Sequence, residues 1–481
     1  MLRSKWKLVL FLAISIIFNT LAVVNIPTAQ AEVLPPSYKI YGYILSATEG
    51  SKAGFTVTLQ GTNKTATTDS DGYFYITGIN TDGVNTTTAN LSLKISKIQY
   101  LSRIIQIGKI TDSLQIGTTE APVNMWAGDI NQDGAIDKLD AIEITKSFNS
   151  SSGDGRYVSL YDLNKDNVVN MSDVMVVASH FNTTTANYPA ITPTPIRHSF
   201  IADDESRSQL HFVDQNNHSK DWNINLPYRC RDYQLIGNNQ LLLSGGDGYY
   251  IYDLNTKKML KEYHNAAYSN TQTVRRTTDG HTFIGYMNNG IVVTELDANN
   301  NAVKTARFSG MSDLRLMRFS SKNTLLIGGA NTAIEADMTG KIIRKLSIPN
   351  TNNVYQILER PNGELLISTG YNVYAGVYDA NGNFIKKFGG KPAPENNLNY
   401  NFFCGMQVLK NGNIVISNWT GHNSGDSSYG VQLLEFTSKG DLVWSWQDPN
   451  VTGSIHGVIV MDGVDPNKFY DDRTGVLQPV D

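Results

Sequence analysis

Cysteine, charged residues and long apolar runs are all scarce in this chain of 481 residues. Two cysteines exclude a disulfide-rich scaffold and a four-cysteine zinc site. Charged residues make up 17% of the chain, and their near balance leaves a formal net charge of −4. A general nucleic-acid-binding protein would carry a basic surface, so we predict no nucleic-acid partner. Glycine is abundant at 40 residues and tyrosine at 24, which favours β-structure and tight turns.

Residues 1–31 have the organisation of a secretory signal peptide. Three basic residues precede an apolar run from Leu8 to Phe18, and the segment ends in the small-x-small pattern Ala29-Gln30-Ala31. An uncleaved membrane anchor is the alternative, but it needs about 20 apolar residues, and polar residues interrupt this stretch. We therefore predict a secreted protein, extracellular or attached to the cell surface, with no membrane span after cleavage.

Residues 37–124 contain short runs of alternating apolar and polar residues, separated by turns. The stretch 68–76, TDSDGYFYI, reads as a strand, an Asp-Gly turn and a second strand. This pattern predicts a small β-sandwich. With Gly42, Gly54 and the TDSDGYFYITGI hairpin, the segment resembles the carboxypeptidase-regulatory-like sandwich family. That resemblance implies a spacer or binding module without catalysis.

Two twelve-residue loops rich in acidic and amide side chains follow at an offset of 33 residues. They read DINQDGAIDKLD at 129–140 and DLNKDNVVNMSD at 162–173. Ca²⁺ prefers six to eight oxygen ligands, and such loops supply them from positions 1, 3, 5, 7, 9 and 12. Gly134 and Asn167 stand at position 6, where the backbone needs a positive φ. The predicted ligands, with carbonyl oxygens from the two position-7 residues, are Asp129, Asn131, Asp133, Ala135, Asp137 and Asp140, then Asp162, Asn164, Asp166, Val168, Asn170 and Asp173.

The duplication favours two calcium ions over the alternative, which is an acidic surface turn. The first loop has four ligand carboxylates and the second three, so we expect the first to bind calcium more tightly. Each loop runs into a short amphipathic helix whose apolar residues share one face. The residues predicted on these two faces are Ala141, Ile144 and Phe148, then Val174, Val177 and Phe181.

This duplicated loop–helix unit, with Asp at position 12, resembles a type I dockerin domain over residues 128–182. The resemblance implies a cohesin module of a scaffold protein as partner, and calcium as the structural metal. The family's partner-binding positions correspond to Lys138, Leu139, Met171 and Ser172. The Ser/Thr pair common in the family is absent from the first loop, which leaves the cohesin class open. A β-sandwich directly before a dockerin is also similar to the arrangement that binds anchoring cohesins.

Residues 183–197 are rich in Thr and Pro and predict a semi-stiff linker. From 198 to 481 a turn followed by an apolar strand recurs about every 40 residues, as in NQLLLS at 239–244 and NTLLIG at 323–328. The first repeat has three strands, and IHGVIV at 455–460 supplies a fourth that would close a ring of six blades. The strand and turn phrases resemble quinoprotein-like and arylsulfotransferase-like propellers. The predicted fold is mainly β and multidomain: a small β-sandwich, a small α-helical calcium-binding dockerin and a six-bladed β-propeller.

Aligning the repeats places Arg231, Gln272, Arg315 and Tyr355 at one level of the inner strands. Such residues suit an anionic or sugar ligand, and a polysaccharide is one partner of this kind. The alternative is that these side chains and trapped water fill the channel. No base and nucleophile can be recognised, so we predict no catalytic residue.

The favoured function is a binding component docked on a scaffold. A polysaccharide-degrading hydrolase or lyase, which would need suitably placed carboxylates, and a sulfotransferase by fold analogy are the alternatives. We expect Cys230 and Cys404 to be buried free thiols, because a bond between them would have to cross a blade.

Overall fold

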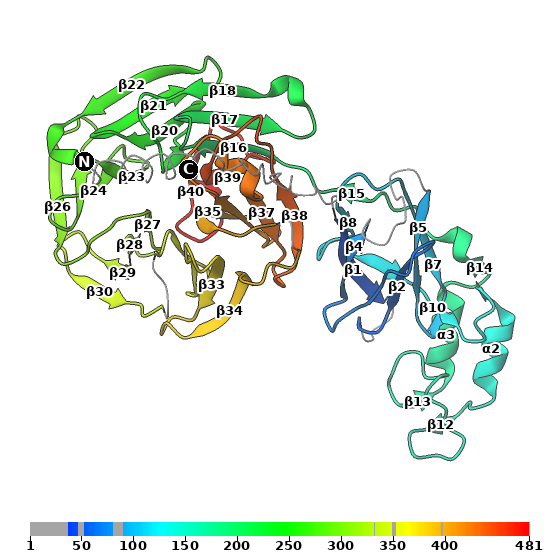
Figure 1. The fold of residues 1–481 in the computed structure, drawn as a ribbon. Coiled ribbons are helices and arrows are strands. Elements are labelled where there is room, and N and C mark those ends of the chain that lie inside the picture. Colours follow the sequence, from blue (N-terminus) through cyan, green and yellow to red (C-terminus); the bar gives the residue numbers. More distant parts are fainter. Residues whose placement is uncertain are drawn as a thin grey trace, which may run out of the picture. The chain divides into compact units, whose positions relative to one another are not determined.

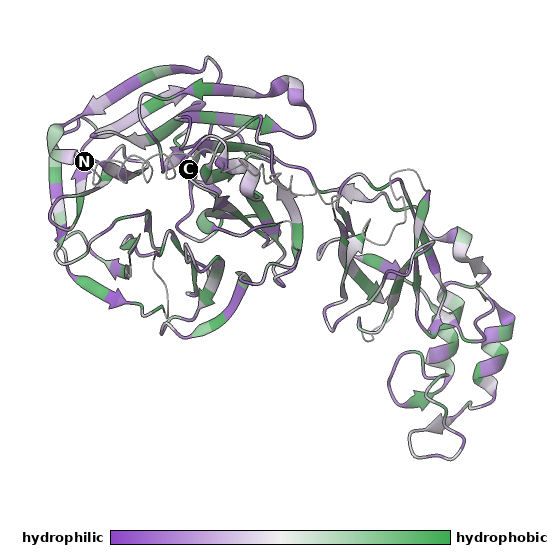
Figure 2. Cartoon of the chain, viewed as in Figure 1, coloured by the Kyte–Doolittle hydropathy of each residue, from purple (hydrophilic) through white to green (hydrophobic). Residues whose placement is uncertain are grey.

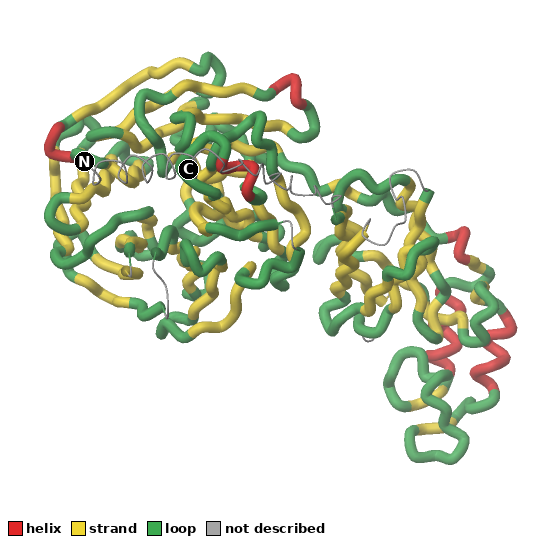
Figure 3. The backbone as a smooth tube through the Cα atoms, viewed as in Figure 1, coloured by secondary structure: helices red, strands yellow, loops and turns green. Residues whose placement is uncertain are grey.

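The computed structural model describes residues 37–46, 52–79, 90–330, 332–348, 353–395 and 398–480. The predicted signal peptide lies outside these residues. Figure 3 shows strands through most of the chain and helices only as short segments. The predicted fold class is confirmed: the chain is mainly β and multidomain, with a two-helix region and many four-stranded antiparallel sheets. None of the helices in the described ranges is long and apolar enough to cross a membrane.

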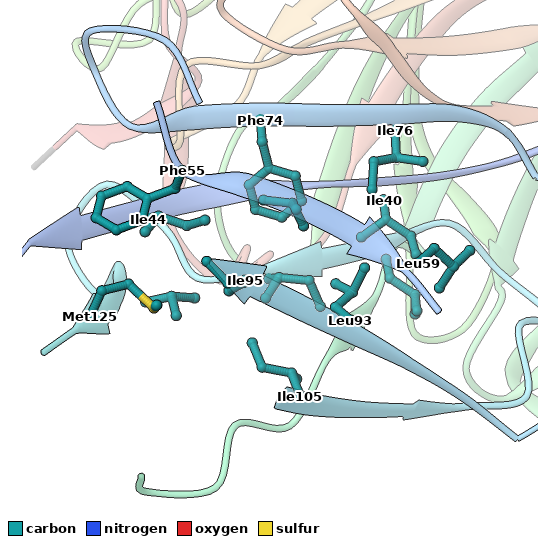
Figure 4. Close-up of a cluster of buried hydrophobic side chains, with 14 of the residues drawn as sticks. Ile40, Ile44, Phe55, Leu59, Phe74, Ile76, Leu93, Ile95, Ile105 and Met125 are labelled. Carbon is teal, nitrogen blue, oxygen red and sulfur yellow. The ribbon is translucent and has the colours of Figure 1, made fainter. Parts of the chain in front are cut away.

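The N-terminal β-region consists of two sheets around one apolar core (Figure 4). Side chains such as Ile40, Phe55, Phe74 and Leu93 are 1% exposed or less, and each such burial contributes about 1.5–3 kcal/mol. The first sheet contains β1 (Tyr38–Ser46), β4 (Tyr73–Ile79), β8 (Leu114–Ile116), β9 (Val123–Met125) and β15 (Thr194–Pro195). The second contains β2 (Thr56–Leu59), β3 (Thr65–Thr67), β5 (Leu91–Ser96) and β7 (Arg103–Gly108). A further pair joins β6 (Gln99–Tyr100) to β10 (Ala127–Asp129).

The predicted linker 183–197 makes more contacts than its composition suggests. Strand β15 pairs with β8, so Thr194 and Pro195 extend the first sheet. Tyr188 stacks on Trp126 with ring centroids 4.1 Å apart, and Arg103 Nη2 donates to the Pro189 carbonyl at 2.6 Å. These contacts anchor much of the segment, whereas the sequence alone indicated only an extended chain.

Six four-stranded antiparallel sheets follow and form a ring (Figure 1). The first three are β16 (Ser199–Asp204), β17 (Gln209–Asp214), β18 (Trp222–Asn225) and β39 (Ile455–Val460); β19 (Tyr233–Leu235), β20 (Gln240–Gly245), β21 (Gly248–Asp253) and β22 (Lys258–His264); and β23 (Thr271–Arg276), β24 (Thr282–Met287), β25 (Ile291–Leu296) and β26 (Ala302–Phe308). The others are β27 (Met317–Phe319), β28 (Leu325–Gly329), β29 (Thr332–Ala336) and β30 (Ile342–Lys345); β31 (Ile357–Glu359), β32 (Leu365–Ser368), β33 (Tyr374–Tyr378) and β34 (Phe384–Gly389); and β35 (Phe402–Val408), β36 (Ile414–Trp419), β37 (Leu433–Phe436) and β38 (Leu442–Trp446).

In five of the six blades, burial falls from the inner strands to the outermost one. Strands β20, β28 and β36 are buried almost throughout, whereas β22, β26 and β30 are exposed at most positions. Figure 2 shows both hydrophilic and hydrophobic residues along these outer strands, and apolar side chains such as Leu260 and Ile343 are among the exposed ones. The outermost strand therefore forms the solvent face of these five blades, whereas β38 of the last blade is mostly buried.

A carboxylate stabilises the turn before the outermost strand of several blades. Asp297 accepts hydrogen bonds from the backbone N–H groups of Asn299 and Asn301, and Asp379 does the same for Asn381 and Asn383. Short acidic side chains commonly close turns in this way. This explains why an Asp recurs at this point of the repeat.

The chain continues past the ring as a C-terminal tail, residues 461–480. Its strands β40 (Phe469–Asp471) and β41 (Gln478–Val480) pair with each other, and Phe469 bridges to Ile236 just after β19. Asp472 accepts from Arg318 Nε at 2.9 Å, and Arg318 also contacts Asp232. Tail residues and inner strands together enclose an axial cavity of about 50 Å³. That volume holds a few water molecules rather than a sugar.

A buried ion pair reinforces the closure of the ring. His198 Nε2 lies 2.9 Å from Glu435 of β37, and His198 Nδ1 lies 2.5 Å from Asp462, which follows β39. Burial alone would lower the pKa of His198, but hydrogen bonds and charges from both carboxylates raise it to about 9. Protonated His198 therefore links the first blade to the last.

We predict that this link makes stability depend on pH. Because the pKa of His198 is raised on folding, its contribution of about 3 kcal/mol is complete below about pH 6.5 and is lost as the pH rises through about 9. Urea unfolding at pH 6.5 and 9.5 should show this loss in the wild type and much less of it in His198→Gln. His218→Gln, an exposed control, should keep the wild-type pH dependence; an equal loss in all three proteins would refute the assignment.

Candidate functional site

The two acidic loops and their helices are related by a repeated pattern of strand pairing. Helix α2 (Lys138–Thr145) follows the first loop and α3 (Met171–Ser179) the second. Strand β11 (Ala135–Ile136) of the first loop pairs with β14 (Thr183–Thr184), after α3. Strand β13 (Val168–Val169) of the second loop pairs in the same register with β12 (Ser150–Ser151), after α2. Each loop is therefore held by the segment that follows the other loop's helix.

The position-12 carboxylates organise both loops through the same hydrogen bonds. Asp140 Oδ1 accepts from the backbone N–H of Ile130 at 2.7 Å, and its Oδ2 accepts from Asp137 N–H at 2.8 Å. Asp173 makes the equivalent bonds with Leu163 at 2.7 Å and Asn170 at 2.9 Å. Both carboxylates are fully buried and also complete a capping box at the start of each helix.

One carboxylate oxygen in each loop is buried without a hydrogen-bond partner among the described residues. These atoms are Oδ1 of Asp129 and Oδ1 of Asp162, the two position-1 side chains. Burial and the nearby charge of Asp140 raise the pKa of Asp129 to about 6. A buried carboxylate oxygen that lacks a donor is unfavourable unless a cation or water contacts it.

The backbone at position 6 matches the predicted loop shape. Gly134 has a φ of +90°, and Asn167 has a φ of +68°. No group of three or more His, Cys, Asp or Glu side chains is gathered as a ready metal site in the described part of the chain. A cation here would need amide and carbonyl oxygens as well, which are the further ligands that a loop of this type offers Ca²⁺. The donor set therefore fits a hard cation.

The four predicted partner-binding residues are exposed at the start of the two helices. Leu139 is 45% exposed and Met171 59% exposed, and Lys138 and Ser172 beside them are also exposed. Ile142 and Met175, which sequence reasoning did not include, are 53% and 61% exposed. They lie three and four residues after Leu139 and Met171, so each pair shares a helix face. We call Leu139, Ile142, Met171 and Met175 the apolar helix surface.

The opposite helix faces pack into a small core. Ile144 and Val177 are 1% exposed or less, in agreement with their predicted positions, and they pack with residues from both loops. Phe181 was expected on the same face but is 46% exposed. That prediction was wrong because α3 ends at Ser179, so helical spacing no longer determines where Phe181 points.

In the propeller, the structure brings the predicted ligand residues towards the axis. Arg231 Nη1 donates to Gln272 Oε1 at 2.8 Å. Arg315 forms an ion pair with Asp313 at 3.0 Å, and Tyr355 is fully buried with its hydroxyl unpartnered among the described residues. The predicted residues thus partly satisfy each other.

Sequence reasoning missed Glu205, which lies at the centre of this axial cluster. Its carboxylate is fully buried and accepts from Arg231 at 3.2 Å and from Trp419 Nε1 at 3.1 Å. His422 Nδ1 lies 3.2 Å away, and His422 is itself 60% exposed. Burial alone would raise the pKa of Glu205, but the cations around it lower that pKa to about 2. Glu205 lies in the turn after β16 rather than on an inner strand, although the acidic run 203–205 was a visible signal.

The two cysteines are buried free thiols, as the sequence predicted. Cys230 and Cys404 are both free and buried, at 2% and 0% exposure. Burial raises the pKa of each thiol well above its usual range. Neither is therefore a reactive thiolate.

Comparison with known proteins identifies one of these regions. Residues 127–182 match the family model described as the dockerin type I domain. The cellulosomal-scaffolding proteins B and A of Acetivibrio thermocellus are each 40% identical over 160 residues, which is 32% of this chain. That stretch is 20% of protein B and 8% of protein A, so this chain spans a fifth or less of either relative.

Similar solved structures cover different parts of the chain. A type II cohesin–X-dockerin complex from Acetivibrio cellulolyticus matches with 38% identity over 31% of this chain and 99% of that one, at a TM-score of 0.29. A protein of unknown function from Bacteroides caccae matches with 16% identity over 55% and 98%, at 0.48. A streptogramin B lyase matches with 14% identity over 58% and 91%, at 0.41.

The paired loops, their capped helices and their shared core thus coincide with the segment that the family model matches. Residues 127–182 of this chain form a type I dockerin domain.

Proposed function

We propose that this protein is secreted and attaches, through its dockerin domain, to a cohesin module of an extracellular cellulosome-type scaffold. The observation that carries the proposal is the dockerin match at 127–182, in which both loops keep the same hydrogen-bond geometry. Dockerin domains of this family bind cohesins, and the scaffolding relatives belong to cellulosomes. The segment 1–31 would direct export and be removed.

Two calcium ions would hold the loops. The first ion would take Asp129, Asn131, Asp133, the Ala135 carbonyl, Asp137 and Asp140, and the second would take the residues 33 positions later. Bound calcium would neutralise carboxylates that otherwise repel each other, and it would supply the missing partner of Asp129 Oδ1 and Asp162 Oδ1. Because the core beneath the helices is small, calcium binding would contribute to its folding free energy.

We predict that titration calorimetry of the full chain detects two bound calcium ions. Substituting the position-1 aspartate of either loop should weaken the calcium site of that loop only. Asp129→Asn and Asp162→Asn should each weaken one site at least tenfold, because the substitution removes a negative ligand. Asp154→Asn, between the loops and outside both ligand sets, is the control. Two unchanged sites in either loop variant would contradict the assignment.

The apolar helix surface would form the centre of the cohesin interface. Its four side chains are exposed although apolar, and Lys138 and Ser172 flank them. Exposed apolar side chains rimmed by polar residues commonly mark interaction sites. Leu139 and Ile142 differ from their counterparts Ser172 and Met175, so the two helices would present different contacts.

We predict that Met171→Asp weakens capture of the protein by a cohesin module at least tenfold. The introduced carboxylate would have to lose water inside an apolar interface. Surface plasmon resonance with immobilised cohesins measures the effect, and Val303→Asp on the exposed strand β26 is the matched control. Capture that persists in EDTA, or that is equal for both variants, would refute this mode of docking.

The propeller would be the cargo, with a ligand site at the axial cluster. Arg231 and Arg315, whose side chains are 24% and 20% exposed, would contact an anionic or sugar ligand through charge-assisted hydrogen bonds, while Gln272 and Tyr355 are buried and would support them. Supporting this, Arg229 is 56% exposed and His422 60% exposed, while Glu205, the buried anion beside them, is already bonded to Arg231 and Trp419. The exposed groups that remain available to a ligand, Arg229 and His422, are therefore hydrogen-bond donors.

We predict that Arg315→Gln lowers the affinity for hexagalacturonate at least fivefold, and that raising salt weakens wild-type binding. Arg307→Gln, exposed on β26, should bind as the wild type does. Calorimetry measures affinity, and a reducing-end assay on the same samples reports cleavage. Release of new reducing ends would instead favour the polysaccharide-degrading alternative.

A further inference from the structure

A groove on the last blade is separate from the axial cluster. It is formed by the segment before β35 together with the loop after β36, which contains the 3₁₀ helix η4 (Asp426–Tyr429). Its volume is about 570 Å³, which falls within the range of known small-molecule sites. By contrast, the axial cavity holds about 50 Å³. The groove is therefore large enough to hold sugar units.

An aromatic side chain stands at the groove with most of its surface free. Tyr429, at the end of η4, is 67% exposed and is the most exposed of the large apolar and aromatic residues described. A phenol ring combines a flat apolar face with a polar hydroxyl. Sugars have the complementary character, because one face of a pyranose carries C–H groups while its edge carries hydroxyls.

Two buried hydroxyl groups in the groove wall have no partner. Tyr400 Oη and Thr420 Oγ1 make no hydrogen bond to any described residue, although the residues are only 5% and 8% exposed. Buried hydroxyls normally have a partner, so an unpaired one indicates a water or a ligand group. Both oxygens are themselves buried, so a polar occupant of the groove would meet them through a water molecule rather than directly.

Two amide side chains add further hydrogen-bonding capacity. Asn399 and Asn401 line the groove and are exposed. Asn401 Nδ2 donates to the Trp419 carbonyl at 3.0 Å, which fixes the side chain and leaves its Oδ1 without a partner among the described residues. The Asn399 amide makes no hydrogen bond to a described residue. Amides both donate and accept, which matches the mixed character of sugar hydroxyls.

The charge of the groove distinguishes it from the axial cluster. Lys391 and Glu395 are its two charged lining residues, and Glu395 is already paired with buried Lys39 at 2.9 Å. The axial cluster instead contains Arg229, Arg231 and Arg315. Most of the described groove lining is uncharged and one lysine, Lys391, is its only charged group not paired in this way, so an uncharged ligand rich in hydroxyls suits the groove better than a polyanion.

We propose that this groove binds a neutral oligosaccharide, with a sugar ring against Tyr429, sugar hydroxyls bonded to the exposed amides of Asn399 and Asn401, and water linking the sugar to the buried hydroxyls of Tyr400 and Thr420. The proposal is independent of the axial ligand. It gives the propeller a role as a glycan-binding cargo.

Calorimetry of the full chain with cellohexaose and xylohexaose tests the proposal. We expect at least one of these neutral probes to bind, and Tyr429→Ala to weaken that binding at least tenfold. Thr420→Val keeps the side-chain shape but removes the hydroxyl, and it should weaken binding severalfold. The control is Tyr228→Ala, which removes a comparably exposed tyrosine outside the groove and should leave binding unchanged.

Circular dichroism and thermal unfolding would establish that each variant is folded before its affinity is interpreted. Failure of both neutral probes to bind at millimolar concentration would overturn the proposal, as would a folded Tyr429→Ala that binds as tightly as the wild type. If only hexagalacturonate binds, and Arg315→Gln removes it, the groove proposal fails while the axial site stands.

Discussion

The pairing of β39 with β16 is the contact on which the propeller depends. It joins Phe200 to Val460 and Ile201 to Ile459, so the last strand of the ring completes the first blade. Without that pairing, the ring would expose two sheet edges. The axial cluster depends on the same closure, because Glu205 follows β16 while His456, whose Nε2 lies 3.7 Å from the Glu205 carboxylate, belongs to β39. Closing the ring therefore also assembles the chemistry at its axis.

The dockerin domain relies on a different constraint, which is that buried acids need partners. Asp140 and Asp173 obtain theirs from backbone N–H groups of their own loops. Asp129 and Asp162 each keep one oxygen without a partner in the described residues. Both loops show this same contrast between a bonded position-12 carboxylate and an unpaired position-1 oxygen, so it follows from the shared loop conformation rather than from one local sequence. Each loop thus keeps one buried carboxylate oxygen that the proposed calcium ion would neutralise.

Local sequence patterns predicted more of the fold than of the sites. Alternating residues and the recurring Asp turns were sufficient to indicate the sheets, because each reflects a short-range physical requirement. The contacts of Glu205 with Trp419 and Arg231 join residues far apart in the chain, so no spacing rule could predict them. The tail 461–480 lacks the repeat period and was missed for the same reason. The resemblances to carboxypeptidase-regulatory-like and quinoprotein-like families remain predictions.

The tail has a consequence for what the propeller can hold. Phe469 and Val476 bridge to the chain just after β19 and at the end of β35, and Asp472 is fixed by Arg318. Residues of the tail therefore occupy part of the central passage, where they line the axial cavity of about 50 Å³. A long polymer cannot thread through it. A ligand of the axial cluster would therefore meet its exposed members, Arg229 and His422, rather than pass along the centre of the ring.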